Sequence, residues 1–203
     1  MYSRYFVIPC IFFIGFACKS SPKVETVEAK DNDGYTERYQ RRKSDYAKEG
    51  LYVKTDPQGN KVEEALYKSD TLDGWRIIYY ETGDTQVLES YRQGLFEGAY
   101  RVYYPGGKTK LSGTYVNNQM TGKWKGFYEN GTLKEEVTFA NNQENGPFVE
   151  YYSNGKLKAQ GSYLDGDNEH GELKLYNEAG IHIKTMECDK GICKTVWQLD
   201  KGD

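Results

Sequence analysis

Apolar and polar side chains alternate one by one along short segments of the chain. In the segment 157–163, Leu157, Ala159, Gly161 and Tyr163 fall on one side, while Lys158, Gln160 and Ser162 fall on the other. The segment 133–139 repeats this alternation. A period of two residues is typical of a β-strand with one buried face, and it excludes an amphipathic helix. The pattern therefore predicts half-buried strands.

These segments recur with a period of 24 residues. Glycines open the successive units at Gly50, Gly74, Gly98, Gly122, Gly146 and Gly171. A second glycine follows nine residues after each, and aromatic residues return five, six and seventeen residues after most of them. Several columns that agree over five or six units indicate a repeat architecture.

Each unit has the turn residues of a β-hairpin. Asn130-Gly131 and Ser153-Asn154-Gly155 separate the two strands within a unit, and Asn-Gly between apolar runs is a strong hairpin signal. A second turn joins each unit to the next, as at Asn117-Asn118 and Asp165-Gly166. We therefore expect an all-β fold, an elongated single-layer antiparallel meander of about six hairpins over residues 50–193. Residues 194–203 form a tail or a final strand.

The motif of residues 122–134, which returns in residues 146–158, resembles the MORN repeat. It is most similar to the bacterial variant with Tyr-Tyr-x-Asn-Gly-Lys-Leu, a form often labelled YwqK-type antitoxin. The resemblance covers about residues 50–193. It implies an elongated array of β-hairpins used for membrane association or protein contact, and it implies no catalytic residue.

The beginning of the chain predicts export. Arg4 precedes a short apolar run that ends at Ala17, as in a secretory signal peptide over residues 1–17. Gly15-Phe16-Ala17-Cys18 resembles a bacterial lipoprotein signal, which implies lipid on Cys18 and a place in the cell envelope, on the outer membrane. The alternative is ordinary cleavage at the same bond, which gives a soluble periplasmic or secreted protein.

Residues 18–49 are dense in charge and poor in apolar side chains. Such a composition cannot bury a core. We therefore expect a flexible tether between the lipidated cysteine and the repeats.

Composition restricts the chemistry. The 27 Lys and Arg against 30 Asp and Glu give a formal net charge of -3, which argues against a nucleic-acid partner. Two His and four Cys are too few for a multi-ligand metal enzyme, and we expect no cofactor and no catalytic residue. Asp165, Asp167 and Glu169 are interpreted as a solvated turn rather than a calcium site.

Aromatic residues make up 15% of the chain. Neighbouring aromatics on one strand point to opposite faces, so one set can remain accessible. The sequence predicts a candidate binding strip at Tyr80, Tyr104, Trp124, Tyr128 and Tyr152. The competing interpretation places these rings in the core of the thin sheet.

Cys188 and Cys193 flank a short turn near the end of the array. Outside the cytoplasm we expect them to form a disulfide, the alternative being two buried thiols.

The function predicted from these observations is that of an exported, lipid-anchored, non-enzymatic binding or scaffold protein with an unidentified protein or envelope partner. Two alternatives remain open at this point. One is an envelope glycan- or peptidoglycan-binding protein, and the other is an envelope inhibitor that resembles an antitoxin or immunity protein.

Overall fold

The structure is a computed structural model that describes residues 23–200. Strands and turns make up this part of the chain, which contains no helix. The strands are β1 (Val24–Lys30), β2 (Thr36–Arg42), β3 (Lys48–Thr55), β4 (Lys61–Lys68), β5 (Thr71–Tyr79), β6 (Thr85–Arg92), β7 (Leu95–Phe96), β8 (Gly98–Tyr103), β9 (Thr109–Val116), β10 (Gln119–Phe127), β11 (Leu133–Ala140), β12 (Gln143–Tyr151), β13 (Leu157–Tyr163), β14 (Gly171–Tyr176), β15 (His182–Asp189) and β16 (Ile192–Gln198).

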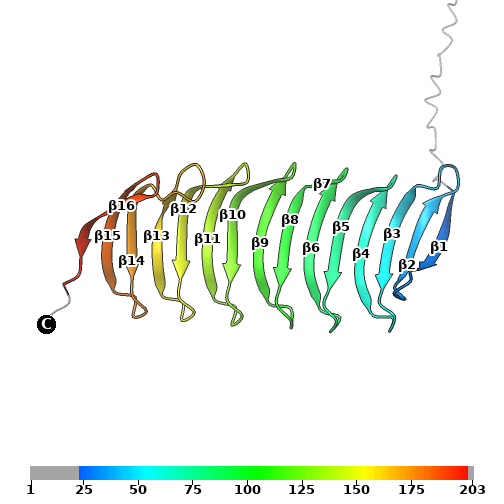
Figure 1. Cartoon of the computed structure of the whole chain (residues 1–203), viewed down its shortest axis with the longest axis horizontal. Helices are drawn as coiled ribbons and strands as arrows, with labels where there is room; N and C mark the ends of the chain where they lie inside the picture. Colours follow the sequence, from blue (N-terminus) through cyan, green and yellow to red (C-terminus); the bar gives the residue numbers. More distant parts are fainter. Residues whose placement is uncertain (1–22, 201–203) are drawn as a thin grey trace, which may run out of the picture.

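All of these strands belong to one open, antiparallel, 16-stranded sheet. Each strand pairs with the strands before and after it in the sequence, except that the short β7 pairs with β6 beside the main path. Figure 1 shows the strands side by side in chain order, from β1 at one end to β16 at the other. The predicted all-β meander is therefore confirmed.

Two kinds of turn follow each other in the chain, and each kind lies along one of the two long edges of the sheet. The turns between units have both central residues at positive φ, as at Asn117 (49°) and Asn118 (64°) or Asn141 (53°) and Asn142 (67°). This backbone matches the right-handed twist of the strands and favours Asn and Gly.

The turns within units follow a different scheme, in which only the glycine takes positive φ. Gly131 lies at 93°, and the Gly131 amide donates to the carbonyl of Tyr128. Asn130 does not take positive φ. Its side-chain oxygen accepts a hydrogen bond from the amide of Thr132, and its side-chain nitrogen donates to the carbonyl of Ser153 in the next unit.

The two faces of the sheet differ in character. One face carries the buried rings, among them Tyr52, Trp124 and Phe148, and we call it the aromatic face. The opposite face carries ion pairs such as those of Lys123 and Lys125 with Glu136, and we call it the polar face. No second layer covers either face within residues 23–200, so the core is one side chain thick.

The tether predicted for residues 18–49 is wrong over the residues that the structure describes. β1 pairs with β2 along its whole length, from Val24 opposite Arg42 to Lys30 opposite Thr36, and β2 continues onto β3. The turn at Asp31–Tyr35 has the same hydrogen bonds as the later turns within units. These residues therefore form one more hairpin of the array.

The physical reason for this error is that a single-layer sheet needs little apolar area. Backbone pairing with β3 and a few rings suffice, and the rings of Tyr39 and Tyr52 lie 6.4 Å apart. Gly34 also lies 25 residues before Gly59, so the glycine column already continued into this region. The predicted signal peptide at residues 1–17 and Cys18 lie outside the described residues.

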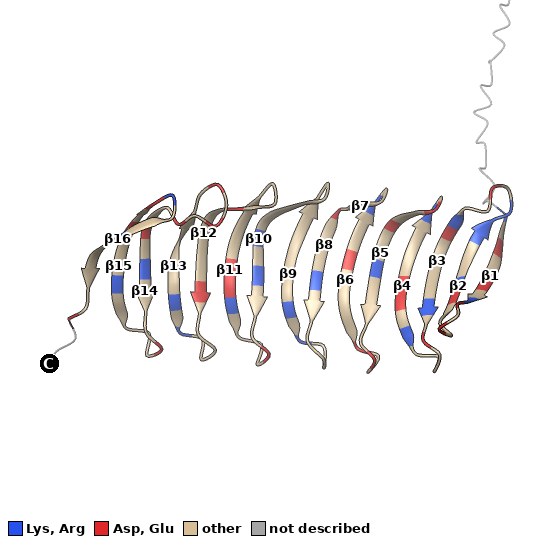
Figure 2. Ribbon diagram, viewed as in Figure 1, with Lys and Arg blue, Asp and Glu red and all other residues tan. Residues whose placement is uncertain are grey.

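At the other end of the sheet, β16 extends to Gln198. Of the two predictions for the end of the chain, a tail or a final strand, the structure therefore has the strand over residues 194–198. Figure 2 shows positive and negative residues interleaved along the sheet, without one large basic patch.

Candidate functional site

The rings of the aromatic face form a continuous chain of contacts across several strands. Ring centroids are 4.5 Å apart for Tyr91 and Phe96, 5.0 Å for Phe96 and Tyr115, and 5.1 Å for Tyr115 and Trp124. Phe148 and Tyr163 stack at 4.2 Å further along. Such pairs stabilise neighbouring strands beyond simple area burial. This face is the structural core of the array.

Glycines beneath the rings make this packing possible. A Cβ atom at Gly113 would lie 2.1 Å from Trp124 Cδ2, and one at Gly161 would lie 3.0 Å from Phe148 Cε1. These two glycines have no side chain because an aromatic ring from the neighbouring strand occupies the space.

The residues of the predicted binding strip fall into two groups with different environments in the structure. Trp124 is only 3% exposed and packs in the core, so it is not an accessible binding residue. Tyr80, Tyr104, Tyr128 and Tyr152 are half-buried and share one arrangement. Their hydroxyl groups donate to the carbonyl oxygens of Tyr103, Phe127, Tyr151 and Tyr176 at 2.7–2.9 Å.

Each of these tyrosines therefore links its own turn to the next unit, and we call the set the tyrosine ladder. The units that open at Gly50 and Gly171 lack it. Asp56 and Asn177 occupy the equivalent positions and accept hydrogen bonds from amides of their own turns. The tyrosine ladder is thus a structural connection between repeats rather than a free strip of rings.

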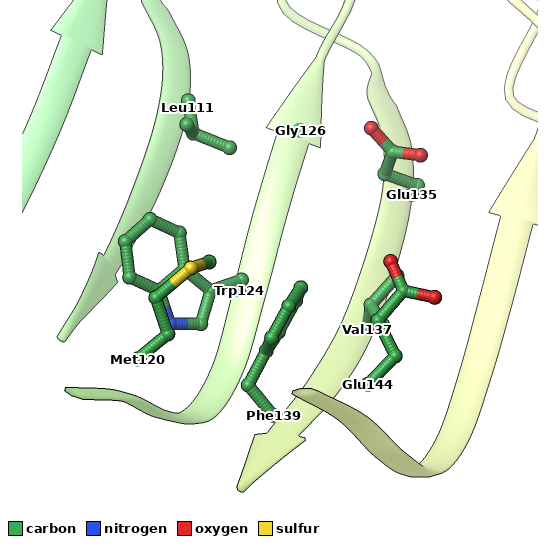
Figure 3. A pocket seen from close by; sticks show the side chains of 8 residues that line it. All are labelled: Leu111, Met120, Trp124, Gly126, Glu135, Val137, Phe139 and Glu144. Atoms are coloured by element: carbon green, nitrogen blue, oxygen red, sulfur yellow. The ribbon is translucent and has the colours of Figure 1, made fainter. Parts of the chain in front are cut away.

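A cavity of about 150 Å³ opens on the aromatic face beside Trp124. We call it the Trp124 cavity, and its wall consists of Leu111, Met120, Trp124, Gly126, Glu135, Val137, Phe139 and Glu144. Figure 3 shows Trp124 beside Met120 and Phe139, with Glu135 and Glu144 on the far side of Phe139. The wall therefore combines apolar surface with two carboxylates.

The electrostatics of this wall are unbalanced. Burial raises the pKa of Glu144, and the nearby carboxylates of Asp167 and Glu135 raise it further. The ammonium nitrogen of Lys134 lies 3.6 Å from a carboxylate oxygen of Glu135 and forms an ion pair with it. The buried indole Nε1 of Trp124 has no hydrogen-bond partner within the described residues.

Nearer the beginning of the array, the aromatic face carries a compensated charge network. Arg76 contacts Glu63 at 2.7 Å and Glu89 at 3.1 Å, and Tyr91 donates to Glu89 at 3.0 Å. The hydrogen bond that Arg76 donates to Glu63 holds the pKa of Arg76 above its ordinary value. Because these charges satisfy one another, they serve packing and are not available to a ligand.

Charged side chains of the polar face also form ion pairs, but the lysines in them are more exposed to solvent. Glu136 contacts Lys123 at 2.6 Å and Lys125 at 3.2 Å, and the hydrogen bond from Lys123 lowers the pKa of Glu136. Tyr79 donates to Glu64; burial and this hydrogen bond raise the pKa of Tyr79 to about 12.

Cys188 and Cys193 form a disulfide across the paired strands β15 and β16. Cys188 belongs to the small core cluster with Phe148, Ala159 and Leu173. In the same two strands, His182 stacks on Trp197 with ring centroids 4.6 Å apart. These contacts fix the last hairpin onto the array.

Two features are absent from residues 23–200. No group of three or more His, Cys, Asp or Glu side chains is placed to hold a metal ion. The same residues include no helix with the length and apolar character that a membrane crossing requires.

Reasoning from the sequence missed Gly126, Glu135 and Glu144, the residues that give the Trp124 cavity its space and its charge. The signal was present in the repeat columns. The preceding unit has Val102, Leu111 and Met120 at these positions, and the unit before it has Ile78, Val87 and Phe96.

Comparison with known proteins identifies the repeat. The MORN repeat variant family matches residues 96–117, 120–141 and 144–165, three consecutive units of the sheet. No curated protein matches the chain. The matched segments share the 24-residue spacing of their glycines with the unit before them, and the glycine of the next unit, Gly171, follows Gly146 after 25 residues. The chain therefore contains repeats of the MORN variant family over residues 96–165.

Proposed function

We propose that the chain is a non-enzymatic scaffold that presents its repeat sheet to a protein partner. MORN repeats are generally protein- or membrane-binding modules, and the matched units lie in the middle of the array. The observation that supports this proposal most strongly is the single open sheet, whose two faces lie uncovered along residues 23–200. Small-molecule catalysis usually takes place in a deep concave pocket.

Site-specific photocrosslinking in cells tests this proposal. A photoreactive residue replaces Lys123 on the polar face, Met120 on the aromatic face, or Glu178 in an exposed turn as the control. We expect one face position to crosslink reproducibly to the same protein, and the turn position not to do so. A chain that crosslinks to no protein from either face would contradict the proposal.

We further propose that the chain is exported and anchored by lipid on Cys18. The support is the signal-like sequence of residues 1–17 followed directly by a cysteine. A Cys18→Ala variant should leave the membrane fraction, whereas a Cys10→Ala variant should remain in it. Equal membrane association of both variants and the unchanged chain would contradict the anchor.

The two alternative functions are not favoured. Glycan binding relied on free tyrosine and tryptophan rings, but the hydroxyl groups of the tyrosine ladder are engaged and Trp124 is buried. No observation specifically supports an inhibitor.

A further inference from the structure

The open sheet ends in two edge strands. Within residues 23–200, β1 pairs with β2 alone and β16 pairs with β15 alone, and Figure 1 shows them at opposite ends of the array. Each edge strand presents backbone N–H and C=O groups that can pair with a strand of another chain. Natural sheets commonly protect such edges with charged side chains. The side chains of β1 and β16 therefore decide what each edge can do.

The β1 edge carries this protection. Its seven residues include Glu25, Glu28 and Lys30, and Glu25 forms an ion pair with Arg41 at 2.8 Å. A strand that paired with β1 would have to place its own side chains beside these three charges. The β1 edge is thus a poor template for strand pairing.

The β16 edge has the opposite character. Ile192 is 73% exposed and Val196 is 63% exposed, and Trp197 and Leu199 are also exposed. Lys194 is the single charged residue of β16. Ile, Val, Thr and Trp favour strands, and this strand has no proline to interrupt pairing. An apolar, exposed edge of this kind favours pairing with a further strand.

Contacts within the last hairpin also hold β16 in an extended conformation. The disulfide described above joins β16 to β15, and the ring of Trp197 stacks on His182. The Leu199 amide donates to the carbonyl of Ile183 at 3.0 Å, so backbone pairing continues one residue beyond the strand. A strand that is already ordered loses little conformational entropy when it binds.

The charges of residues 194–200 indicate which strand pairs with this edge. The sequence Lys-Thr-Val-Trp-Gln-Leu-Asp has a positive residue at one end, a negative residue at the other and five uncharged residues between them. Antiparallel pairing of two identical segments about Trp197 brings the Lys194 end of each copy to the Asp200 end of the other. Parallel pairing would instead bring like charges together. The segment is therefore complementary to itself.

Pairing of β16 with β1 of another copy is the competing arrangement. It would set the apolar edge of β16 against the three charges of β1. It would also repeat without closing and build a fibre, whereas two-fold pairing closes at two copies. A two-fold dimer leaves only the charged β1 edges free, and charged edges resist further pairing.

We propose that the chain forms a two-fold symmetric dimer in which β16 pairs antiparallel with β16 of a second copy. The two-fold axis is perpendicular to the sheet and passes near Trp197. The two sheets join into one, and the aromatic faces of both copies lie on the same side. The inference goes beyond the proposed scaffold function and does not depend on it, but it doubles the surface that one assembly presents.

Native mass spectrometry of the full chain, purified in detergent, tests the dimer through a charge swap. The unchanged chain should be a dimer at micromolar concentration. Lys194→Glu and Asp200→Lys each place like charges at both ends of the pairing, so each should weaken dimerisation roughly tenfold or more. An equal mixture of the two variants, one of them tagged, should form a heterodimer because opposite charges then meet at both ends.

Three outcomes of this experiment would overturn the proposal. They are a monomeric unchanged chain, single variants that dimerise as well as the unchanged chain, and a mixture that stays monomeric. Both substituted positions are exposed, so the variants should fold normally, and circular dichroism verifies this. A heterodimer formed from two variants that are each monomeric also requires both variants to be folded.

Glu28→Lys is the matched control on the β1 edge, and it should leave the dimer unchanged. Loss of assembly in this variant, or oligomers that grow beyond two copies with concentration, would indicate pairing of β16 with β1 and overturn the proposal. The photocrosslinking experiment samples the two faces of the sheet and not its edge. A monomeric chain that still crosslinks to a protein partner would therefore remove the dimer and leave the scaffold function intact.

Discussion

At the scale of single residues, the fold depends on pairs in which a ring covers a glycine. Trp124 lies over Gly113 on the neighbouring strand, and no side chain fits between them. The strength of this pairing is measurable because each partner can be changed by itself and together with the other.

We predict strong coupling between these two positions. Trp124→Ala should cost about 3–5 kcal/mol of unfolding free energy, since a large buried ring is lost. Gly113→Ala should cost at least about 1–3 kcal/mol because its Cβ meets the indole. In a Trp124→Ala background, however, Gly113→Ala should cost almost nothing. Denaturant unfolding of the four chains checks this cycle, and additive costs would contradict the packing described.

Glu144 and Glu136 should respond to pH with opposite signs. The raised pKa of Glu144 means that the folded chain binds this proton more tightly than the unfolded chain. The ionised carboxylate therefore costs stability above its folded pKa, and that cost disappears as the pH falls through this value. Glu144→Gln should raise the melting temperature by about 1–3 °C at pH ~7 and leave it unchanged near pH ~3.5.

Glu136 is the matched control on the polar face. Its lowered pKa means that its ionised form stabilises the folded chain, and this contribution is lost as the pH falls through the folded pKa. Glu136→Gln should therefore lower the melting temperature at neutral pH. Calorimetry at both pH values checks the pair, and shifts of the same sign in both variants would be inconsistent with these environments.

At the scale of elements, the tyrosine ladder connects each hairpin to the next. Tyr128 donates to the carbonyl of Tyr151, whereas the Tyr151 hydroxyl makes no hydrogen bond within the described residues. Tyr128→Phe should cost about 0.5–1.5 kcal/mol, the net value of one hydrogen bond. Tyr151→Phe should cost less than half of this amount. Thermal unfolding compares the two variants, and equal costs would mean that the ladder does not stabilise the array.

The hairpin of β1 and β2 should behave as part of the sheet. β2 pairs with a strand on each side, so its amides are protected from solvent. Hydrogen exchange read by mass spectrometry should find Thr36–Arg42 exchanging at least about a hundredfold more slowly than an unfolded chain. Exchange at the rate of an unfolded peptide would support a flexible tether instead.

The sequence was sufficient for the elements whose turns carry strong local chemistry. The turns at Asn117-Asn118 and Asn141-Asn142 follow directly from residues that tolerate positive φ. The hairpin before Lys48 escaped prediction because its composition is polar and its edge strand needs few apolar contacts. The cavity escaped prediction because Gly126, Glu135 and Glu144 lie far apart along the chain and meet only through the strand register.

At the scale of the whole molecule, the chain stays extended because its units contact only their neighbours. Strand order follows chain order from β1 to β6 and from β8 to β16, so no contact folds the array back on itself. Stability in such arrays is shared between adjacent units. The disulfide between Cys188 and Cys193 supports the last hairpin, which has a neighbour on only one side.

Small-angle X-ray scattering of a chain that begins at residue 23 tests the extended sheet most directly. Neighbouring strands lie about 4.8 Å apart, so the sheet should give a maximum dimension of at least about 65 Å and a radius of gyration of roughly 20 Å or more. A compact globule of this length has a radius of gyration of about 16 Å. A value near that of the globule would contradict the account, whereas a long, asymmetric distance distribution is the result it predicts.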